Sequence, residues 1–295
     1  NIIDKTLTDG PIFSNKYSNK YSVKVDERLF FNRYSIYRSD IISTIKSDTF
    51  SVQVARDLYI TKSYTDSMYL QMDTSKVKTR GKYLYSDCGY YYFKKIIEKS
   101  YNTTLDTAIS NYFTLPLGMF HTTYNPLNKF PINQIAPTEQ DLMFRNQTVR
   151  GFVHDPGAAM LGGVGGHAGL FSTASDLAII LQMYLNGGTY GGKRYLNDST
   201  ITRFATMQFP NNRRGLGFDK PEPNAKKINP VSNYCSLQSY GHSGFSGTLV
   251  WVDPKYDLIY IFLSNRIHPN AYNKKLIKMD IRQRVQDVIY QSIIE

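Results

Sequence analysis

Cysteine is scarce in this chain, since only Cys88 and Cys235 occur among its 295 residues. Two cysteines cannot form the dense disulfide framework of a small secreted scaffold. They make no CxxC pair and no Cys/His cluster with zinc-like spacing, and the five histidines also lack ligand spacing. We therefore expect two free thiols and no metal site, and the count leaves the redox compartment open.

Long apolar runs are missing as well. The longest apolar stretches, such as residues 258–263, have the length of a strand, whereas a membrane-spanning helix needs ~18 apolar residues. Residues 1–4 lack the charged and apolar regions of a signal peptide, so we expect any export signal to lie upstream of them. The sequence thus predicts no membrane span.

Blocks of like charge are also absent. The chain has 35 Lys and Arg against 24 Asp and Glu, a formal net charge of +11, and these residues are scattered. The 24 tyrosines follow no RNP-type pattern. We therefore favour an ordinary basic surface over a nucleic-acid-binding face and expect no nucleic-acid partner, although a mild attraction for anionic substrates or envelope polymers fits the charge.

What is present suffices for a sizeable core, because 41% of the residues are hydrophobic and 20% are charged. Residues 1 to about 80 show weak periodicity, and residues 50–60 fit a strand or an extended segment as well as a helix. Apolar residues at helical spacing predict an amphipathic helix around residues 92–97. A second helix is predicted to begin after a Thr104 cap and to end at Pro116.

The middle of the chain is rich in glycine. Residues 157–169 predict a tightly packed loop, because each glycine costs a helix interior ~1 kcal/mol. Thr173 and Asp176 then indicate a capping box that opens a helix. His154-Asp155 could be an acid–base pair or a metal pair, but we favour a loop hydrogen bond, and we interpret His167 as structural.

The last sixty residues change character. Residues 248–252 and 258–263 predict two strands joined by a turn, and such short spacing favours antiparallel neighbours. After Pro269 an amphipathic helix is predicted to run almost to Glu295. We expect one domain over residues 1–295, mainly helix and loop to about residue 235, then a sheet hairpin and C-terminal helix from about 236. This layout predicts an α+β fold.

Three phrases could carry chemistry. Tyr85-Ser86-Asp87 stands just before the first helix, and Gly241-His242-Ser243-Gly244 runs into the first strand of the hairpin. Between them, residues 165–177 read Gly-Gly-His-Ala-Gly-Leu-Phe-Ser-Thr-Ala-Ser-Asp-Leu. In order and spacing these phrases resemble the Tyr-x-Asn box, the His-x-Gly form of the Lys-Thr-Gly box, and the Gly-Leu-x-Ser-Thr-Ala-x-Asp-Leu phrase of one superfamily. It is the β-lactamase and penicillin-binding-protein superfamily of serine hydrolases, in its class C β-lactamase, D-Ala-D-Ala carboxypeptidase and esterase branch.

The resemblance implies a β-lactamase/transpeptidase-like α+β fold. An antiparallel sheet, which we expect to be incomplete, would be flanked by helices and accompanied by a helical subdomain. The implied chemistry is acyl transfer through a covalent acyl-enzyme without a cofactor, and the implied setting is exported, periplasmic or cell-envelope. Related enzymes act on cell-wall D-Ala peptides, β-lactams or small esters.

The resemblance also implies roles for individual residues. Tyr85 would be the proton shuttle and Asp87, where asparagine is more usual, a partner of substrate or lysine. His242, Ser243 and Gly244 would contact the substrate. In a second register, residues 86–88 resemble the Ser-Asp-Asn box of other branches, but the flanking Tyr-rich helix favours the Tyr-box register.

The nucleophile poses a problem. The Ser-x-x-Lys motif of the superfamily places serine and lysine one helical turn apart, many tens of residues before the Tyr box. Its two matches here, Ser43-Thr-Ile-Lys46 and Ser75-Lys-Val-Lys78, stand too close to Tyr85, and a chance match is expected in so serine- and lysine-rich a chain. We therefore expect the Ser-x-x-Lys segment to precede this chain. A missing N-terminal segment or a partner chain would then complete the sheet.

Two further possibilities stay open at this stage. The chain could be a non-catalytic module that binds a peptide or glycan through the same cleft. Ser43 and Lys46 could also form an unorthodox site.

Overall fold

The structure, a computed structural model, describes residues 3–4, 12–25, 28–76, 81, 83–224 and 226–294. The chain forms two compact units, and each is described by itself. The first contains Asn1–Ala108, Tyr124–Leu170 and Ile267–Tyr272, and the second contains Ile109–Thr123, Phe171–Arg266 and Asn273–Glu295. The expected single domain stays a prediction.

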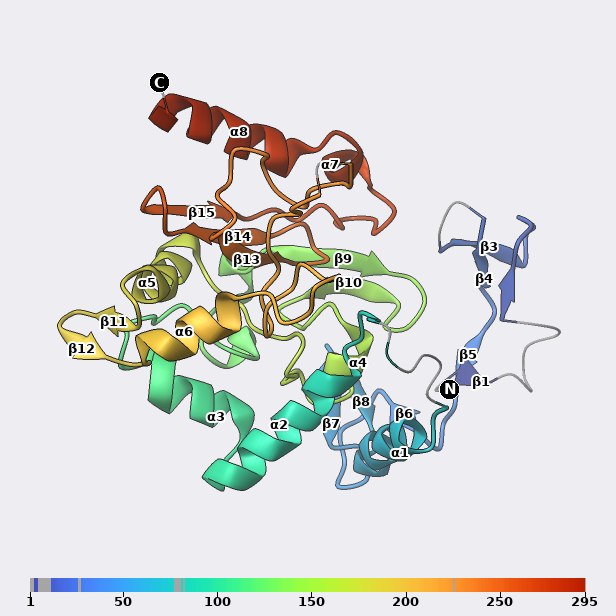
Figure 1. Cartoon of the computed structure of the whole chain (residues 1–295). Helices are drawn as coiled ribbons and strands as arrows, with labels where there is room; N and C mark the ends of the chain where they lie inside the picture. Colours follow the sequence, from blue (N-terminus) through green and yellow to red (C-terminus); the bar gives the residue numbers. More distant parts are fainter. Residues whose placement is uncertain are drawn as a thin grey trace. The chain divides into compact units, whose positions relative to one another are not determined.

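Short antiparallel sheets fill the N-terminal part of the first unit (Figure 1). Strand β1 pairs with β5, while the other sheets have the orders β2-β4-β3 and β6-β8-β7. The bounds are Ile3–Asp4 (β1), Phe13–Ser14 (β2), Tyr21–Lys24 (β3), Phe30–Asn32 (β4), Ile36–Tyr37 (β5), Ile42–Ser43 (β6), Val52–Ala55 (β7) and Leu58–Ile60 (β8). Residues 50–60 are therefore a strand pair, and the helical interpretation is wrong.

The rest of the first unit consists of helices and one hairpin. The bounds are Lys62–Asp73 (α1), Cys88–Tyr101 (α2), Leu105–Ile109 (α3, at the boundary with the second unit), Pro126–Asn128 (η2), Ile132–Gln134 (η3), Pro137–Asp141 (β9), Gln147–Arg150 (β10) and Pro156–Ala159 (α4). Helix α2 confirms the helix predicted around residues 92–97. It ends at Asn102, whose left-handed φ of 48° suits an asparagine. Helix α4 ends after one turn, at Ala159, and the rest of the glycine-rich stretch is a loop. The cost of glycine in a helix predicts such a loop.

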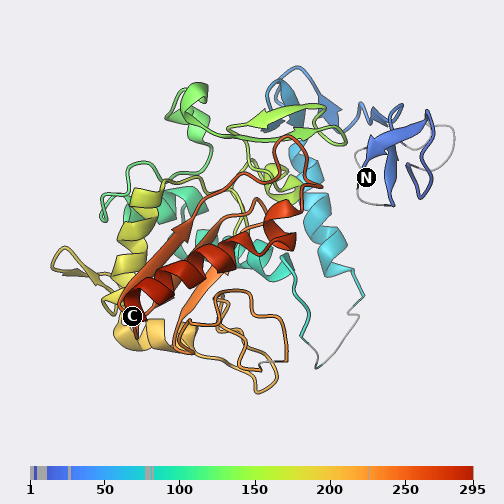
Figure 2. The same ribbon diagram turned by 90° about the horizontal axis from the view of Figure 1, so that it is seen from above.

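The second unit is organised around one antiparallel sheet with the order β13-β14-β15 (Figure 2). The bounds are Ser110–Thr114 (η1, a π-helical turn), Ala174–Leu185 (α5), Thr189–Tyr190 (β11), Lys193–Arg194 (β12), Asp198–Ala205 (α6), Tyr240–Ser243 (β13), Leu249–Asp253 (β14), Leu258–Phe262 (β15), Lys275–Lys278 (α7) and Ile281–Ile294 (α8). The predicted hairpin is confirmed, with Leu249 opposite Phe262 and Asp253 opposite Leu258.

Alternation along β14 divides the core of this unit into two layers. Val252 packs with Leu181 of α5 and with α6, whereas Trp251 packs with Ile289 of α8. Because side chains alternate along a strand, helices cover both faces of the sheet. The structure thus confirms that the C-terminal helix packs on one face. In the described residues this sheet has three strands.

Two helix predictions need correction. The C-terminal helix is not continuous, because Asp280 adopts a left-handed φ of 50° and separates α7 from α8. The capping box is only half formed. The Thr173 hydroxyl accepts a hydrogen bond from the Asp176 amide, but the Asp176 carboxylate accepts bonds from the His121 amide and the Thr122 hydroxyl instead. A buried carboxylate finds tertiary donors there, which residue spacing along the chain does not reveal.

Candidate functional site

Tyr85 and Asp87 lie in the first unit, at the entrance to α2. Tyr85 is exposed, and Asp87 occupies the N-cap position of the helix. The Asp87 carboxylate caps no amide of α2, while the Ser86 hydroxyl accepts a hydrogen bond from the Cys88 amide at 3.2 Å. Ser86 thus supplies the side-chain hydrogen bond at this helix start, and the side chains of Tyr85 and Asp87 remain at the surface.

His242, Ser243 and Gly244 lie in the second unit, on the edge strand β13 and the turn after it. The strand begins with a close approach, because a Cβ on Gly241 would lie 2.1 Å from the Val250 carbonyl oxygen. A Cβ on Gly244 would lie 2.4 Å from the Thr248 hydroxyl, so a larger residue there would require that side chain to move. Glycine at both ends thus sets the course of the backbone around His242 and Ser243.

The outer edge of β13 is only partly occupied. Asp219 pairs with Gly241 there, with N···O distances of 2.7 and 3.1 Å. Because hydrogen-bonding direction alternates along a strand, the backbone groups of Ser243 point to the same edge as those of Gly241. Beyond the bridge to Asp219, no further strand of the described residues pairs with this edge.

The two ring contacts of His242 determine its tautomer. Its Nδ1 lies 2.8 Å from the Ser243 carbonyl oxygen, which can only accept, so Nδ1 carries the hydrogen. Its Nε2 lies 3.1 Å from an Arg214 nitrogen, which can only donate. In this arrangement Nδ1 of His242 donates to the Ser243 carbonyl and Nε2 accepts from Arg214, so the cationic group beside the ring is Arg214.

Arg214 was missed by the sequence analysis. Its guanidinium lies 3.2 Å from the Asp219 carboxylate, which also accepts bonds of 2.8 and 3.0 Å from Arg213. Two guanidiniums thus share one buried carboxylate, which in turn belongs to the segment paired with β13. No spacing rule identifies Arg214, because 28 residues separate it from His242 and the segment between them is irregular.

His154 and Asp155 each have a hydrogen-bonding partner farther away in the sequence. His154 lies 3.0 Å from Glu139, while the partner of Asp155 is His167, at 2.9 Å. Burial would raise the pKa of Asp155, but hydrogen bonds from His167 and from the Ala158 amide outweigh it and leave the pKa lowered. Tyr91 stacks on the buried His167 ring with centroids 4.4 Å apart, so His167 is structural, as predicted.

Neither Ser-x-x-Lys match lies on a helix at its serine. Ser43 is the last residue of β6, its hydroxyl accepts from the Ile45 amide at 3.0 Å, and Lys46 follows in an exposed turn. Ser75 follows α1 and donates to the Met72 carbonyl, and Lys78 lies outside the described residues. The helical arrangement in which such a serine and lysine share one face is therefore not formed at Ser43.

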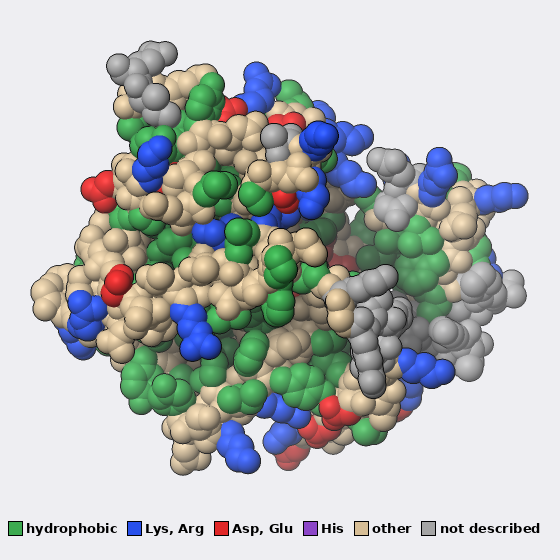
Figure 3. Space-filling model, in the orientation of Figure 1, with side chains coloured by type: hydrophobic (Ala, Val, Ile, Leu, Met, Phe, Trp, Pro, Cys, Tyr) green, Lys and Arg blue, Asp and Glu red, His purple; other side chains and the backbone are tan. Residues whose placement is uncertain are grey.

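The described part of the chain, residues 3–4, 12–25, 28–76, 81, 83–224 and 226–294, shows neither a metal cluster nor a membrane-spanning helix. It contains no group of three or more His, Cys, Asp or Glu side chains that could hold a metal ion. None of its helices has the length and apolar character needed to cross a membrane. Cys88 and Cys235 are free, as expected. Lys and Arg are scattered over the face seen in Figure 3 and form no single block there.

Comparison with known proteins supports the resemblance. The Beta-lactamase family model matches residues 68–280. A Salmonella gallinarum protein that carries the provisional name D-alanyl-D-alanine carboxypeptidase is 34% identical over 235 residues, which cover 76% of this chain and 54% of that protein. A Salmonella newport protein of the same provisional name matches with the same identity and coverage. The chain spans about half the length of these relatives.

A solved structure supports the fold. A mutant form of simvastatin synthase from Aspergillus terreus superposes with a TM-score of 0.54 at 15% identity, covering 79% of this chain and 61% of that one. At such identity the likeness concerns the fold alone. The predicted α+β fold, with antiparallel sheets flanked by helices, is confirmed. Since the family model covers most of the chain, this protein belongs to the β-lactamase family.

Proposed function

We propose that this chain carries part of the active site of a serine hydrolase that acts on cell-wall peptides ending in D-Ala-D-Ala. The observation that carries the proposal is the 34% identity, over 76% of the chain, to proteins named for D-alanyl-D-alanine carboxypeptidase activity. The setting would be the cell envelope, where such peptides occur. β-Lactams and small esters are the alternative acyl donors.

The proposed chemistry is acyl transfer in two steps. A serine hydroxyl attacks the carbonyl carbon of the penultimate D-Ala and gives its proton to a base. The C–N bond then breaks, and the departing amine of the terminal D-Ala takes up a proton. Water attacks the resulting ester, which releases the shortened peptide and restores the serine.

The surface residues of the two boxes suit this reaction. Tyr85 is exposed at the entrance to α2, where its phenol would move the proton between serine and leaving amine. Asp87, two residues on, would bind substrate or the lysine. The Ser243 edge would pair with the acyl group, while Gly244 lets the strand turn sharply behind it.

His242 would stand where the Lys-Thr-Gly box has a positively charged lysine. Both ring nitrogens of His242 are engaged, by Ser243 and Arg214, so the ring would orient the Ser243 carbonyl. Arg214 supplies the positive charge next to it, and the carboxylate of the terminal D-Ala would meet that charge.

The nucleophile is the second part of the proposal. We propose that none of the 295 residues serves as the acylated serine, because Ser43 lies on a strand and forms no helical pair with Lys46. The same observation favours a second candidate function, a non-catalytic module that binds a D-Ala-ended peptide.

Intact-mass spectrometry after incubation with benzylpenicillin tests both parts. We expect no adduct on residues 1–295, and one penicilloyl group on a longer protein in which a Ser-x-x-Lys segment precedes this chain. In that protein Tyr85→Phe should slow acylation by about 10²-fold or more, the usual contribution of a proton-transfer group. The matched control is Tyr83→Phe, which removes a neighbouring exposed phenol and should leave the rate unchanged.

The outcomes separate the alternatives. An adduct on Ser43 would overturn the proposal that the nucleophile lies elsewhere. Failure to label either protein, with either benzylpenicillin or an activated nitrophenyl ester, would reject the hydrolase and favour the binding module. Equal acylation rates of the Tyr85→Phe and Tyr83→Phe variants would show that Tyr85 takes no part in the reaction.

A further inference from the structure

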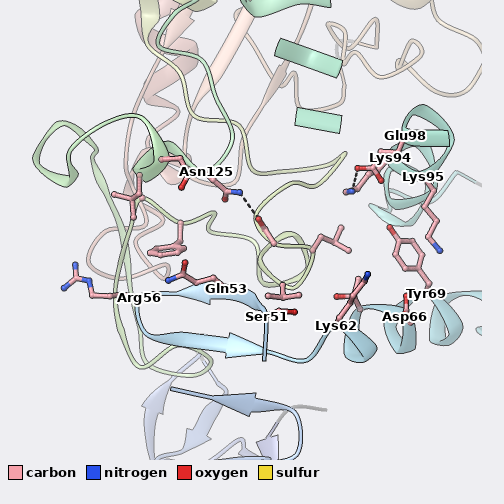
Figure 4. A pocket seen from close by; sticks show the side chains of 18 residues that line it. Ser51, Gln53, Arg56, Lys62, Asp66, Tyr69, Lys94, Lys95, Glu98 and Asn125 are labelled. Atoms are coloured by element: carbon pink, nitrogen blue, oxygen red, sulfur yellow. Dashed lines mark hydrogen bonds and ion pairs between the residues drawn. The ribbon is translucent and has the colours of Figure 1, made fainter. Parts of the chain in front are cut away.

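A pocket of about 680 Å³, lined by both polar and apolar side chains, lies within the first unit (Figure 4). Its walls come from β7, from α1 and α2, and from the loops around Asn125 and Gly162. The volume is within the range of ~300–1,000 Å³ that is usual for sites that bind small ligands or short segments. Tyr85 and Asp87 do not line it.

The pocket lies along the free edge of a strand. Three consecutive residues, Ser51, Val52 and Gln53, line it, although their side chains alternate between the two faces of the sheet. Consecutive residues can all face one cavity when the cavity runs beside the strand. Strand β7 is indeed the edge of the sheet β6-β8-β7, so its outer backbone groups are available to an extended peptide.

Several charged groups of the pocket already have partners. Lys94 forms an ion pair with Glu98, drawn as a dashed line in Figure 4. The Lys95 ammonium lies 3.4 Å from the centroid of the Tyr69 ring. These contacts fix the α2 wall, and the charges of Lys94 and Glu98 offset each other.

The remaining charges favour an anionic ligand. Outside the Lys94–Glu98 pair, the charged lining residues are Arg56, Lys62, Lys95 and Asp66, which leaves three positive charges against one negative. In Figure 4, Ser51 and Gln53 lie between Arg56 and Lys62, and Tyr69 and Lys95 lie beyond Lys62. An elongated ligand would therefore meet hydrogen-bonding groups between two cationic side chains.

We propose that this pocket binds an extended peptide segment that carries a carboxylate side chain. Its backbone pairs with the outer edge of β7, and its carboxylate meets Lys62 or Arg56. The inference rests on the proposed function, because it assigns the pocket to an acidic part of the peptide that the hydrolase acts on. It adds an accessory binding site beyond the Tyr85 and His242 boxes.

Fluorescence anisotropy with short labelled peptides tests the site without any need for catalysis. The probe is the pentapeptide Ala-Glu-Lys-Ala-Ala built from L-residues only, and its counterpart carries glutamine in place of glutamate. We expect the glutamate peptide to bind residues 1–295 more tightly than the glutamine peptide. Lys62→Ala and Arg56→Ala should each weaken the glutamate peptide by up to about tenfold, since a charge-assisted hydrogen bond contributes roughly 1.4 kcal/mol here.

Matched controls make the result specific. Lys99→Ala removes an exposed lysine of α2 that does not line the pocket and should leave binding unchanged. Lys62→Arg keeps the charge and should restore most of the affinity lost in Lys62→Ala. A glutamate peptide with N-methylated backbone amides cannot donate to the β7 edge and should bind weakly.

Several results would overturn the inference. They are equal affinity for the glutamate and glutamine peptides, no effect of Lys62→Ala and Arg56→Ala, or full binding of the N-methylated peptide. Tight binding of an N-acetylated chitooligosaccharide that competes for the same residues would assign the pocket to a glycan instead. Because the probes lack D-Ala, a failure here leaves penicillin acylation as an independent test of the proposed hydrolase.

Discussion

His242 illustrates how far the chemistry of one residue depends on its neighbours. A histidine next to glycines can donate, accept or carry a charge, and its type alone does not decide among these states. The carbonyl of Ser243 on one side and the guanidinium of Arg214 on the other leave one arrangement of hydrogens. Arg214 is itself held by Asp219, whose backbone pairs with Gly241.

Replacement of Arg214 should therefore change the tautomer of His242. In Arg214→Ala, Nε2 loses its donor, and we expect the Nε2–H tautomer to become populated to a comparable extent. Ring ¹⁵N chemical shifts distinguish the tautomers, and with five histidines the spectrum can be assigned with His242→Gln. Arg203→Ala, an exposed arginine of α6, is the control. A ring spectrum of His242 that stays the same in Arg214→Ala would contradict the assignment.

Asp155 gives a second prediction at this scale. Its folded pKa lies below the ordinary value of 3.8, so the carboxylate contributes stability above that value and loses it as pH falls through the folded pKa. Asp155→Asn can still cap α4 but loses the charged partner of His167. We expect a loss of about 0.5–1 kcal/mol at pH 7, reduced by the partial exposure of this side chain.

Thermal unfolding at several pH values measures this effect. The gap between wild type and Asp155→Asn should narrow as the pH falls below 3.8, because the wild-type carboxyl then becomes neutral too. The exposed Asp48→Asn variant serves as a control. A gap that widens in acid would show that the carboxylate does not stabilise the fold in its charged form.

At the scale of elements, α8 is attached to the sheet by a buried polar network as well as by apolar contacts. The Tyr290 hydroxyl of α8 donates to the carboxylate of Asp253 at 2.6 Å, and both residues are almost fully buried. Ser236 donates to the same carboxylate through its amide and its hydroxyl, at 2.8 and 2.6 Å. The Asp253 carboxylate thereby links three parts of the unit: the end of β14, the loop before β13 and the C-terminal helix.

Tyr290→Phe should destabilise this element. The variant keeps the ring and removes one donor from a buried carboxylate, so we expect a loss of about 1–3 kcal/mol in the free energy of unfolding. The control is Tyr234→Phe, whose hydroxyl also bonds to α8, through Gln291, but at an exposed position, and it should cost less than about 0.5 kcal/mol. Urea unfolding followed by circular dichroism measures the free energy of unfolding of both variants. Equal losses in the two would contradict the proposed contribution of the Asp253 network.

For the whole molecule, the composition predicted a chain with a sizeable hydrophobic core, and the three phrases predicted the family. The net charge of +11 and the scattered Lys and Arg indicated a basic surface without a nucleic-acid stripe. The family match over residues 68–280 agrees with the phrases, all of which fall inside it. The N-terminal sheets precede the matched residues, and the sequence analysis could say little about them.

Features that depend on the local pattern of apolar residues were predictable from the order of the residues alone. The short apolar run of residues 258–263 predicted β15, and apolar residues at helical spacing predicted α2, because the length and spacing of apolar residues indicate which segments can be buried. The tertiary structure alone decided the break at Asp280, the pairing of Asp155 with His167, the contact between Arg214 and His242, and the pocket beside β7. Each of these depends on groups brought together by packing, and local periodicity carries no information about which distant donor will satisfy a buried acceptor.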